Sequence, residues 1–117
     1  MATTVEHVPH TATSGCAVER TLSVLKDHWS LLILRELMEK QSRFNELKRS
    51  IDGISAKVLS ERLKLFTEAG IADKTIYPEV PIKVVYSLTP RGQELSKVID
   101  VIRVWGDKWM PVPGHES

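Results

Sequence analysis

Residues 70–92 of this 117-residue chain read GIADKTIYPEVPIKVVYSLTPRG, and this stretch decides the fold. Two runs rich in β-branched and aromatic residues, 75–77 and 84–88, flank a turn that Pro78 and Pro81 keep out of a central ladder. The pattern predicts a two-stranded ribbon with an exposed tip. Lys83 lies near that tip, where its ammonium could reach a phosphate backbone; a solvated lysine on a plain hairpin is the alternative.

Three helices are predicted upstream of the ribbon from the spacing of apolar residues. The first is short and starts at Ala17, and the second, from about 29 to 40, is apolar on nearly every face and is the expected central buried element. Ser42 is expected to cap the third helix. Its apolar face comprises Phe44, Leu47 and Ile51. The segment 52–54, Asp-Gly-Ile, then breaks the helix.

A fourth helix is predicted from the N-cap Ser55 to Ala69, and Gly70 is expected to close it in the left-handed conformation. One side of its helical wheel carries Leu59, Leu63 and Phe66. Lys57 and Lys64 fall on the opposite side and face outward if the apolar side packs on the second helix. Two helices joined by a short Gly-containing turn make a helix-turn-helix, whose second helix lies in the major groove of DNA.

A fifth helix of about 20 residues, 90–110, follows the ribbon, with Thr89 as its cap and Pro90 at its first position. Its apolar stripe comprises Leu95, Val98, Ile99, Ile102, Trp105 and Trp109. This is more apolar surface than one small domain can cover, so we expect a dimer through the terminal helices, with Leu22 of the first helix also in the interface. In the alternative, Trp105 and Trp109 fold back on their own core.

Composition fits one domain, with a loose arm over residues 1–13, a folded domain over 14–110 and a flexible tail over 111–117. The net charge is only +1, but residues 40–64 hold seven Lys and Arg against three Asp and Glu, which localises a positive field. A single cysteine, Cys16, agrees with a reducing compartment. No apolar run approaches the roughly 20 residues of a membrane span. We therefore expect a cytoplasmic protein without membrane contact.

A family resemblance is carried by Cys16 with Glu19 and Leu22, Trp29 with 32–34 (Leu-Ile-Leu), 43–47 (Arg-Phe-Asn-Glu-Leu), 53–59 (Gly-Ile-Ser-Ala-Lys-Val-Leu), Gly70-Ile71, 77–81 (Tyr-Pro-Glu-Val-Pro), 86–92 (Tyr-Ser-Leu-Thr-Pro-Arg-Gly) and Trp105-Gly106. In order and spacing these residues resemble the HxlR family of prokaryotic transcription regulators. The resemblance implies a mainly α, dimeric winged helix-turn-helix related to the MarR group, with a small two- or three-stranded β wing. Two positions depart from the family pattern: Ala17 replaces a proline, and 26–28 (Lys-Asp-His) replace Gly-Gly-Lys.

These observations predict a sequence-specific DNA-binding regulator, a repressor that binds a palindromic operator as a homodimer and can regulate its own gene. The residues expected to contact DNA are Arg43, Arg49, Ser55, Ala56, Lys57, Ser60, Lys64 and Lys83. Phosphate contacts would supply salt-dependent affinity and base contacts specificity. A winged-helix module for protein interaction is the alternative, but it would not need the positive window. No catalytic residues, metal site or cofactor are expected.

Cys16 stands at the start of a helix, where the macrodipole favours a reactive thiolate. One hypothesis is that oxidants or electrophiles modify Cys16, through an intersubunit or a mixed disulfide, and thereby change the dimer and its affinity for DNA. The alternative is a small buried hydrophobic residue. A pocket for a small-molecule effector between the terminal helices, near Trp29 and Trp105, competes with the cysteine as the sensing device.

Overall fold

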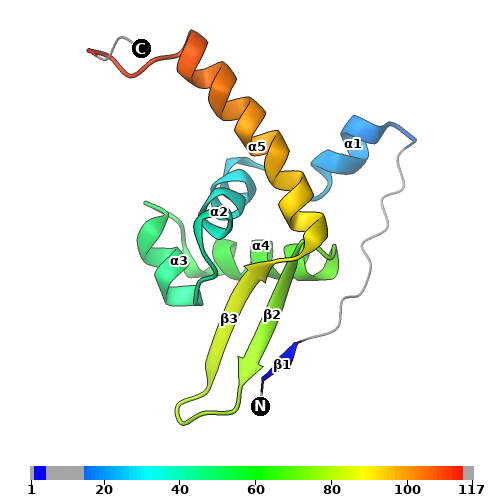
Figure 1. Ribbon diagram of the computed structural model, residues 1–117, viewed down its shortest axis with the longest axis vertical. Helices are drawn as coiled ribbons and strands as arrows, with labels where there is room; N and C mark the ends of the chain where they lie inside the picture. The colour runs from blue at the N-terminus through cyan, green and yellow to red at the C-terminus, as the bar shows by residue number, and fades with distance from the viewer. Residues whose placement is uncertain (1, 5–14, 115–117) are drawn as a thin grey trace.

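The structure is a computed structural model that describes residues 2–4 and 15–114 (Figure 1). In chain order its elements are β1 (Thr3–Thr4), α1 (Ala17–Leu22), α2 (His28–Glu39), α3 (Phe44–Ser50), α4 (Ala56–Glu68), β2 (Ala72–Tyr77), β3 (Lys83–Leu88) and α5 (Pro90–Trp109). The helices form the body, the sheet extends from one end of it, and α5 projects from the other end (Figure 1). The predicted mainly α winged helix-turn-helix is confirmed.

The helix α2 runs through the middle of the body and contacts α3, α4, α5 and β3. The centre of the core consists of side chains that are at most 1% exposed: Ile33, Leu34, Leu47, Ile51, Leu59, Leu63 and Phe66. The prediction that the second helix is the central buried element is therefore confirmed. It begins one residue earlier than expected because the Asp27 side chain caps it by accepting a hydrogen bond from the Ser30 amide at 3.1 Å.

The start of α3 differs from the prediction. Ser42 was expected to be its N-cap, but Ser42 is buried and its backbone forms a bridge with Tyr86, with N–O distances of 2.9 and 2.8 Å. Arg43 takes the N-cap position, and its amide donates to the Glu46 carboxylate at 2.9 Å. The prediction that Ser42 caps the helix was wrong because its backbone pairs with β3, a strand that is distant in sequence.

Hydrogen bonds fix the ends of α4 and the start of α5 as predicted. Ser55 caps α4 by accepting from the Val58 amide at 3.1 Å, and Gly70 ends the turn with a φ of +74°. Thr89 caps α5 by accepting from the Gly92 amide at 3.0 Å, with Pro90 at the first helical position. The strands β2 and β3 pair antiparallel between these helices, with Tyr77 opposite Lys83 at the tip.

A third strand is supplied by the N-terminal arm. In β1, Thr3 pairs with Ile76 and Thr4 with Thr75, on the edge of β2 that β3 leaves open. The predicted loose arm over 1–13 is therefore wrong for these two threonines. Most of the other residues of that segment lie outside the described part of the chain. In the predicted flexible tail, residues 111–114 follow α5 and form no helix or strand. Residues 115–117 lie outside the described part of the chain.

Candidate nucleic-acid interface

The turn between α3 and α4 sets the angle at which α4 leaves the body. Ile51 and Ile54 anchor the turn in the core, and Gly53 adopts a φ of +83°, a conformation that L side chains rarely adopt. A Cβ on Gly53 would lie 3.7 Å from the ring of Trp29. The helix-turn-helix is thus built on one side of α2, with α4 held by its buried face.

The opposite side of α4 is exposed. Lys57 and Lys64 lie on it, whereas Leu59, Leu63 and Phe66 are buried, as the helical wheel predicted. Ala56 and Ser60 are exposed as well. The Ser55 side-chain oxygen accepts the capping hydrogen bond, and its O–H group can still donate to a further partner. This side of α4 can therefore offer ammonium and hydroxyl donors to a ligand.

A salt bridge fastens α4 to the start of α2. Arg62 donates from Nε to Asp27 Oδ1 at 3.3 Å and from Nη2 to Asp27 Oδ2 at 2.6 Å. This hydrogen-bonded guanidinium lowers the pKa of Asp27 to about 2, and the carboxylate raises the pKa of Arg62 in return. From the sequence, Arg62 was expected only to be one base of the positive window, and its role in joining α4 to α2 was not predicted.

The positive charge available over residues 40–64 is consequently smaller than the number of Lys and Arg residues suggests. Besides Arg62, Lys40 is paired with Glu46 at 3.2 Å. The amide of Arg43, and then Lys40, hold the pKa of Glu46 below its usual range, so this carboxylate stays ionised within the window. Exposed bases that remain on α3 and α4 are Arg43, Lys48, Arg49, Lys57 and Lys64. Lys48 was not among the predicted DNA contacts, although the sequence already placed it in the same window.

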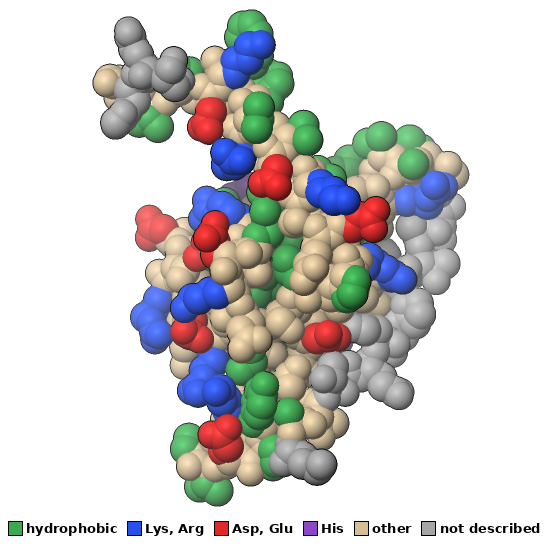
Figure 2. Space-filling model, in the orientation of Figure 1, with side chains coloured by type: hydrophobic (Ala, Val, Ile, Leu, Met, Phe, Trp, Pro, Cys, Tyr) green, Lys and Arg blue, Asp and Glu red, His purple; other side chains and the backbone are tan. Residues whose placement is uncertain are grey.

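A groove of about 610 Å³ separates α3 from the wing. Its lining comprises Arg43, Phe44, Asn45, Glu46, Arg49, Ile82, Lys83 and Val84. The structure thereby brings Lys83 of the wing together with Arg43 and Arg49, which the sequence placed on the third helix. Lys83 Nζ lies 5.2 Å from the centroid of the Tyr77 ring across the strand pair. Figure 2 shows Lys and Arg side chains over α3 and beside the wing, with Asp and Glu among them.

The residues predicted for a dimer interface divide into two groups. Ile99 is buried among the core residues of its own subunit, and Leu95 packs against them, so both side chains contribute to the fold of the subunit. The remaining members are exposed: Leu22, Val98, Ile102, Trp105 and Trp109. The alternative in which Trp105 and Trp109 fold back on their own core is wrong, since these two residues are 57% and 62% exposed.

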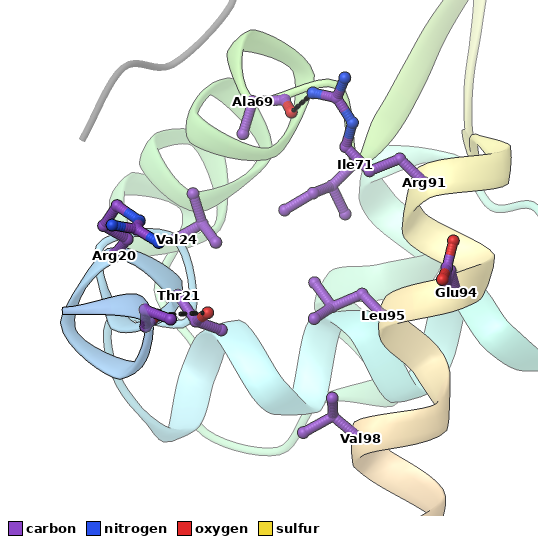
Figure 3. A pocket seen from close by; sticks show the side chains of 10 residues that line it. Arg20, Thr21, Val24, Ala69, Ile71, Arg91, Glu94, Leu95 and Val98 are labelled. Atoms are coloured by element: carbon purple, nitrogen blue, oxygen red, sulfur yellow. Dashed lines mark hydrogen bonds between the residues drawn. The ribbon is translucent and has the colours of Figure 1, made fainter. Parts of the chain in front are cut away.

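Cys16 lies immediately before α1 and is exposed, which contradicts the alternative of a small buried hydrophobic residue. A cavity does separate the terminal helices α1 and α5, but Trp29 and Trp105, predicted to lie near it, are not among its lining residues (Figure 3). Within residues 2–4 and 15–114, no group of three or more His, Cys, Asp or Glu side chains could hold a metal ion. None of the described helices has the length and apolarity to cross a bilayer.

Residues 24–113 match the family described as HxlR-like helix-turn-helix. The regulator YodB of Bacillus subtilis (strain 168) is 37% identical over 92 residues, which cover 79% of this chain and 82% of YodB. Its reduced form superposes with a TM-score of 0.71 at 36% identity, covering 87% of this chain and 100% of YodB. A diamide-treated form of YodB is also similar, with a TM-score of 0.69 at 35% identity, covering 84% of this chain and 97% of that one.

The redox regulator HypR is similar in both of its solved states. Its reduced form has a TM-score of 0.75 at 31% identity, covering 80% of this chain and 92% of HypR. Its oxidised form has a TM-score of 0.77 at 32% identity, covering 83% of this chain and 100% of HypR. The family match spans most of the chain, and the relatives are regulators with the same arrangement of helices and wing. This chain therefore belongs to the HxlR family and is a transcriptional regulator with a DNA-binding winged helix-turn-helix.

Proposed function

We propose that the chain is a homodimeric repressor that places α4 of each subunit in successive major grooves of a palindromic operator. The observation that carries this proposal is the exposed side of α4, which offers ammonium and hydroxyl groups to a ligand. The groove between α3 and the wing adds three further basic side chains. Lys57 and Ser60 would contact base edges or nearby phosphates, and Lys64 would reach the backbone. Arg43, Arg49 and Lys83 would contact phosphates on either side.

The dimer is proposed from the surface of the terminal helices. Val101, Val104, Trp105 and Trp109 expose apolar side chains along the part of α5 that projects from the body, and Val18 and Leu22 do so on α1. An apolar surface of this extent marks an interaction site. A second copy of the chain supplies the same surface, and a two-fold dimer matches the symmetry of a palindrome.

We further propose that Cys16 is a thiol switch of DNA binding. Its exposure makes it accessible to oxidants, and its place before α1 connects it to the proposed dimer surface. Two Cys16 thiols, or one and a small thiol, would lose two protons and two electrons to an oxidant such as diamide and form a disulfide. The similarity to the redox regulator HypR, and to YodB, whose structure was also solved after diamide treatment, supports this.

The test is fluorescence anisotropy on DNA from upstream of the chain's own gene against scrambled DNA, at two salt concentrations and with or without diamide. We expect selective binding that weakens steeply with salt, because neutralised phosphates release counterions. Lys57→Ala should weaken selective binding by about 1–3 kcal/mol if Lys57 contacts a base edge. Unchanged affinity at moderate salt would remove Lys57 from the interface, and binding without salt dependence would favour a protein-interaction module.

The cysteine is tested with Cys16→Ser in the same assay. Diamide should abolish binding by the wild-type protein and leave the serine variant bound. A serine variant that responds to diamide as the wild type does would contradict the switch while leaving the DNA-binding proposal intact. Non-reducing mass spectrometry then separates an intersubunit disulfide from a mixed one.

A further inference from the structure

A cavity of about 580 Å³ lies between α1 and α5, where the C-terminal end of α4 also reaches it. Its lining comprises Ala17, Arg20, Thr21, Val24, Ala69, Ile71, Arg91, Glu94, Leu95 and Val98. Figure 3 shows Val24, Ile71, Leu95 and Val98 converging on the space between the two helices. A volume of this size, with mainly apolar walls and a few polar groups, is typical of sites for small molecules.

The charged groups of the cavity are two guanidiniums and one carboxylate. Arg91 Nη1 donates to the Ala69 carbonyl at 2.9 Å, and Arg20 Nη1 donates to the Gly15 carbonyl at 2.8 Å. These bonds orient both side chains at the cavity, and a guanidinium has five N–H donors, of which the Ala69 bond uses one of Arg91's. Glu94 is the single acidic lining residue, and the remaining N–H donors of Arg91 favour an anion.

The cavity is distinct from the surface proposed for the dimer. On α1 the cavity residues are Ala17, Arg20 and Thr21, whereas the exposed apolar side chains are Val18 and Leu22. Val24, just after α1, also lines the cavity. On α5 the cavity uses the first two turns up to Val98, and the exposed stripe continues from there to Trp109. Only Val98 belongs to both sets. A second subunit on the stripe would therefore leave the cavity walls to another occupant.

The cavity also adjoins the joint between α4 and α5. Thr89 Oγ1 donates toward the Gly70 and Ile71 carbonyls at 2.5 and 3.0 Å, and a Cβ on Gly92 would lie only 2.1 Å from the Ile71 oxygen. The end of α4 and the start of α5 are therefore closely packed. A molecule that contacts Ile71 and Arg91 would act on both helices at the point where they meet.

We infer that this cavity binds a small monocarboxylic acid with an aryl or branched alkyl body, and that its occupancy changes the affinity of the protein for DNA. The carboxylate pairs with Arg91 and Arg20, and the apolar body lies against Val24, Leu95 and Val98. The effect on DNA rests on the proposed function, whereas binding of the acid does not.

The test is isothermal titration calorimetry of the full chain with 2-naphthoate and with its neutral amide, 2-naphthamide. We expect the acid to bind roughly tenfold or more tightly than the amide, because hydrogen bonds to charged groups contribute more than neutral ones. Arg91→Gln and Arg20→Gln should each remove most of this preference. Arg35→Gln, which neutralises an exposed arginine of α2 outside the cavity, is the matched control and should leave it unchanged.

A second pair of variants does not depend on the charged groups. Ala17→Trp places an indole at the cavity wall and should block the acid, while Val18→Trp adds the same ring to the neighbouring residue, which does not line the cavity. Equal affinity for the acid and the amide, no binding of either, or binding that survives Ala17→Trp would each overturn the site.

The DNA arm repeats the anisotropy measurement with and without 2-naphthoate. A change in DNA affinity that Ala17→Trp abolishes supports the coupling, and an unchanged affinity with the acid bound overturns it. If the protein without the acid shows no selective DNA binding, the proposed function fails, and the calorimetry still decides the cavity.

Discussion

The two halves of α5 carry similar apolar residues in opposite surroundings. In the first half Gly92 and Ile99 are buried and Leu95 packs on the core of the same subunit. In the second half Val101 is 70% exposed and Trp105 57% exposed, on a helix that projects from the body (Figure 1). The first half stabilises the fold, and the second half has its apolar side chains available for association.

This difference predicts that substitutions in the two halves change different quantities. A side chain of the first half should change the free energy of unfolding of the subunit. A side chain of the second half should change the dissociation constant of the dimer, and stability only through protein concentration. The variants below test that division, from the largest expected effect to the smallest.

The largest effect is expected for Gly92→Ala. A Cβ at this position would meet the Ile71 carbonyl oxygen at 2.1 Å, a backbone atom that cannot move without separating α4 from α5. We expect unfolding in urea to require about 3 kcal/mol less free energy, at the upper end for overpacked sites. Gly106→Ala is the control in the second half, because a Cβ there meets no atom of the subunit within 4 Å.

Gly106→Ala should leave the subunit folded and raise helix stability by up to about 1 kcal/mol through propensity. Comparable losses of stability in the two glycine variants, measured by urea titration at several protein concentrations, would contradict the division of α5.

The next effect is expected for Ile99→Ala. Ile99 is 9% exposed and contributes to the core of its own subunit, so truncation should lower the free energy of unfolding by about 2–3 kcal/mol. Val101→Ala, on the exposed side of the same helix, should change it by less than about 0.5 kcal/mol. If the loss in Ile99→Ala disappears at high protein concentration, Ile99 acts in the dimer and not in the core.

Association is tested with Trp105→Ala. A large aromatic side chain at the centre of an interface commonly accounts for about 2 kcal/mol or more of binding, which is roughly a thirtyfold rise in the dimer dissociation constant. Sedimentation equilibrium measures that constant directly, and Lys97→Ala on the first half of α5 is the control. A monomeric wild-type protein, or a Trp105→Ala variant that dimerises normally, would remove the second half of α5 from the interface.

The ends of elements and the helix-turn-helix were predictable from the sequence because their determinants are local. Ser55, Gly70 and Thr89 act within one turn of their own position, and the apolar face of α4 follows from a period of 3.6 residues. The same periodicity could not show that the apolar stripe of α5 has a buried first half and an exposed second half. It identifies which side chains share a face, but not whether Ile99 is covered by its own subunit.

The candidate site was predictable as a set of bases but not as a surface. The groove between α3 and the wing depends on how two elements pack, and β3 also displaced Ser42 from its expected cap. The pairing of Arg62 with Asp27 joins residues 35 positions apart, and no local pattern indicates it. The departure from the family pattern at residues 26–28 drew attention to this loop, but not to the partner of Asp27.

That ion pair allows a third region to be compared with the two halves of α5, because it joins the middle of α4 to the start of α2. Asp27 has two functions: it caps α2 through the Ser30 amide and it pairs with Arg62. Asparagine retains a capping oxygen and lacks the charge. Asp27→Asn therefore separates the ion pair from the cap.

The smallest effect is expected for Asp27→Asn, and it should depend on pH. Because folding lowers the pKa of Asp27 from 3.8 to about 2, the stabilisation is complete above pH 4 and is lost as the pH falls toward 2. Its side chain is 30% exposed, and solvent screening reduces the expected difference from wild type to about 1 kcal/mol at pH 6. Urea titrations at pH 6 and near pH 2 should show this difference and then its disappearance. Asp52→Asn, at an exposed position of the turn before α4, is the control. A difference for Asp27→Asn that persists at pH 2 would mean that a weaker cap of α2, and not the loss of the ion pair with α4, accounts for the change in stability.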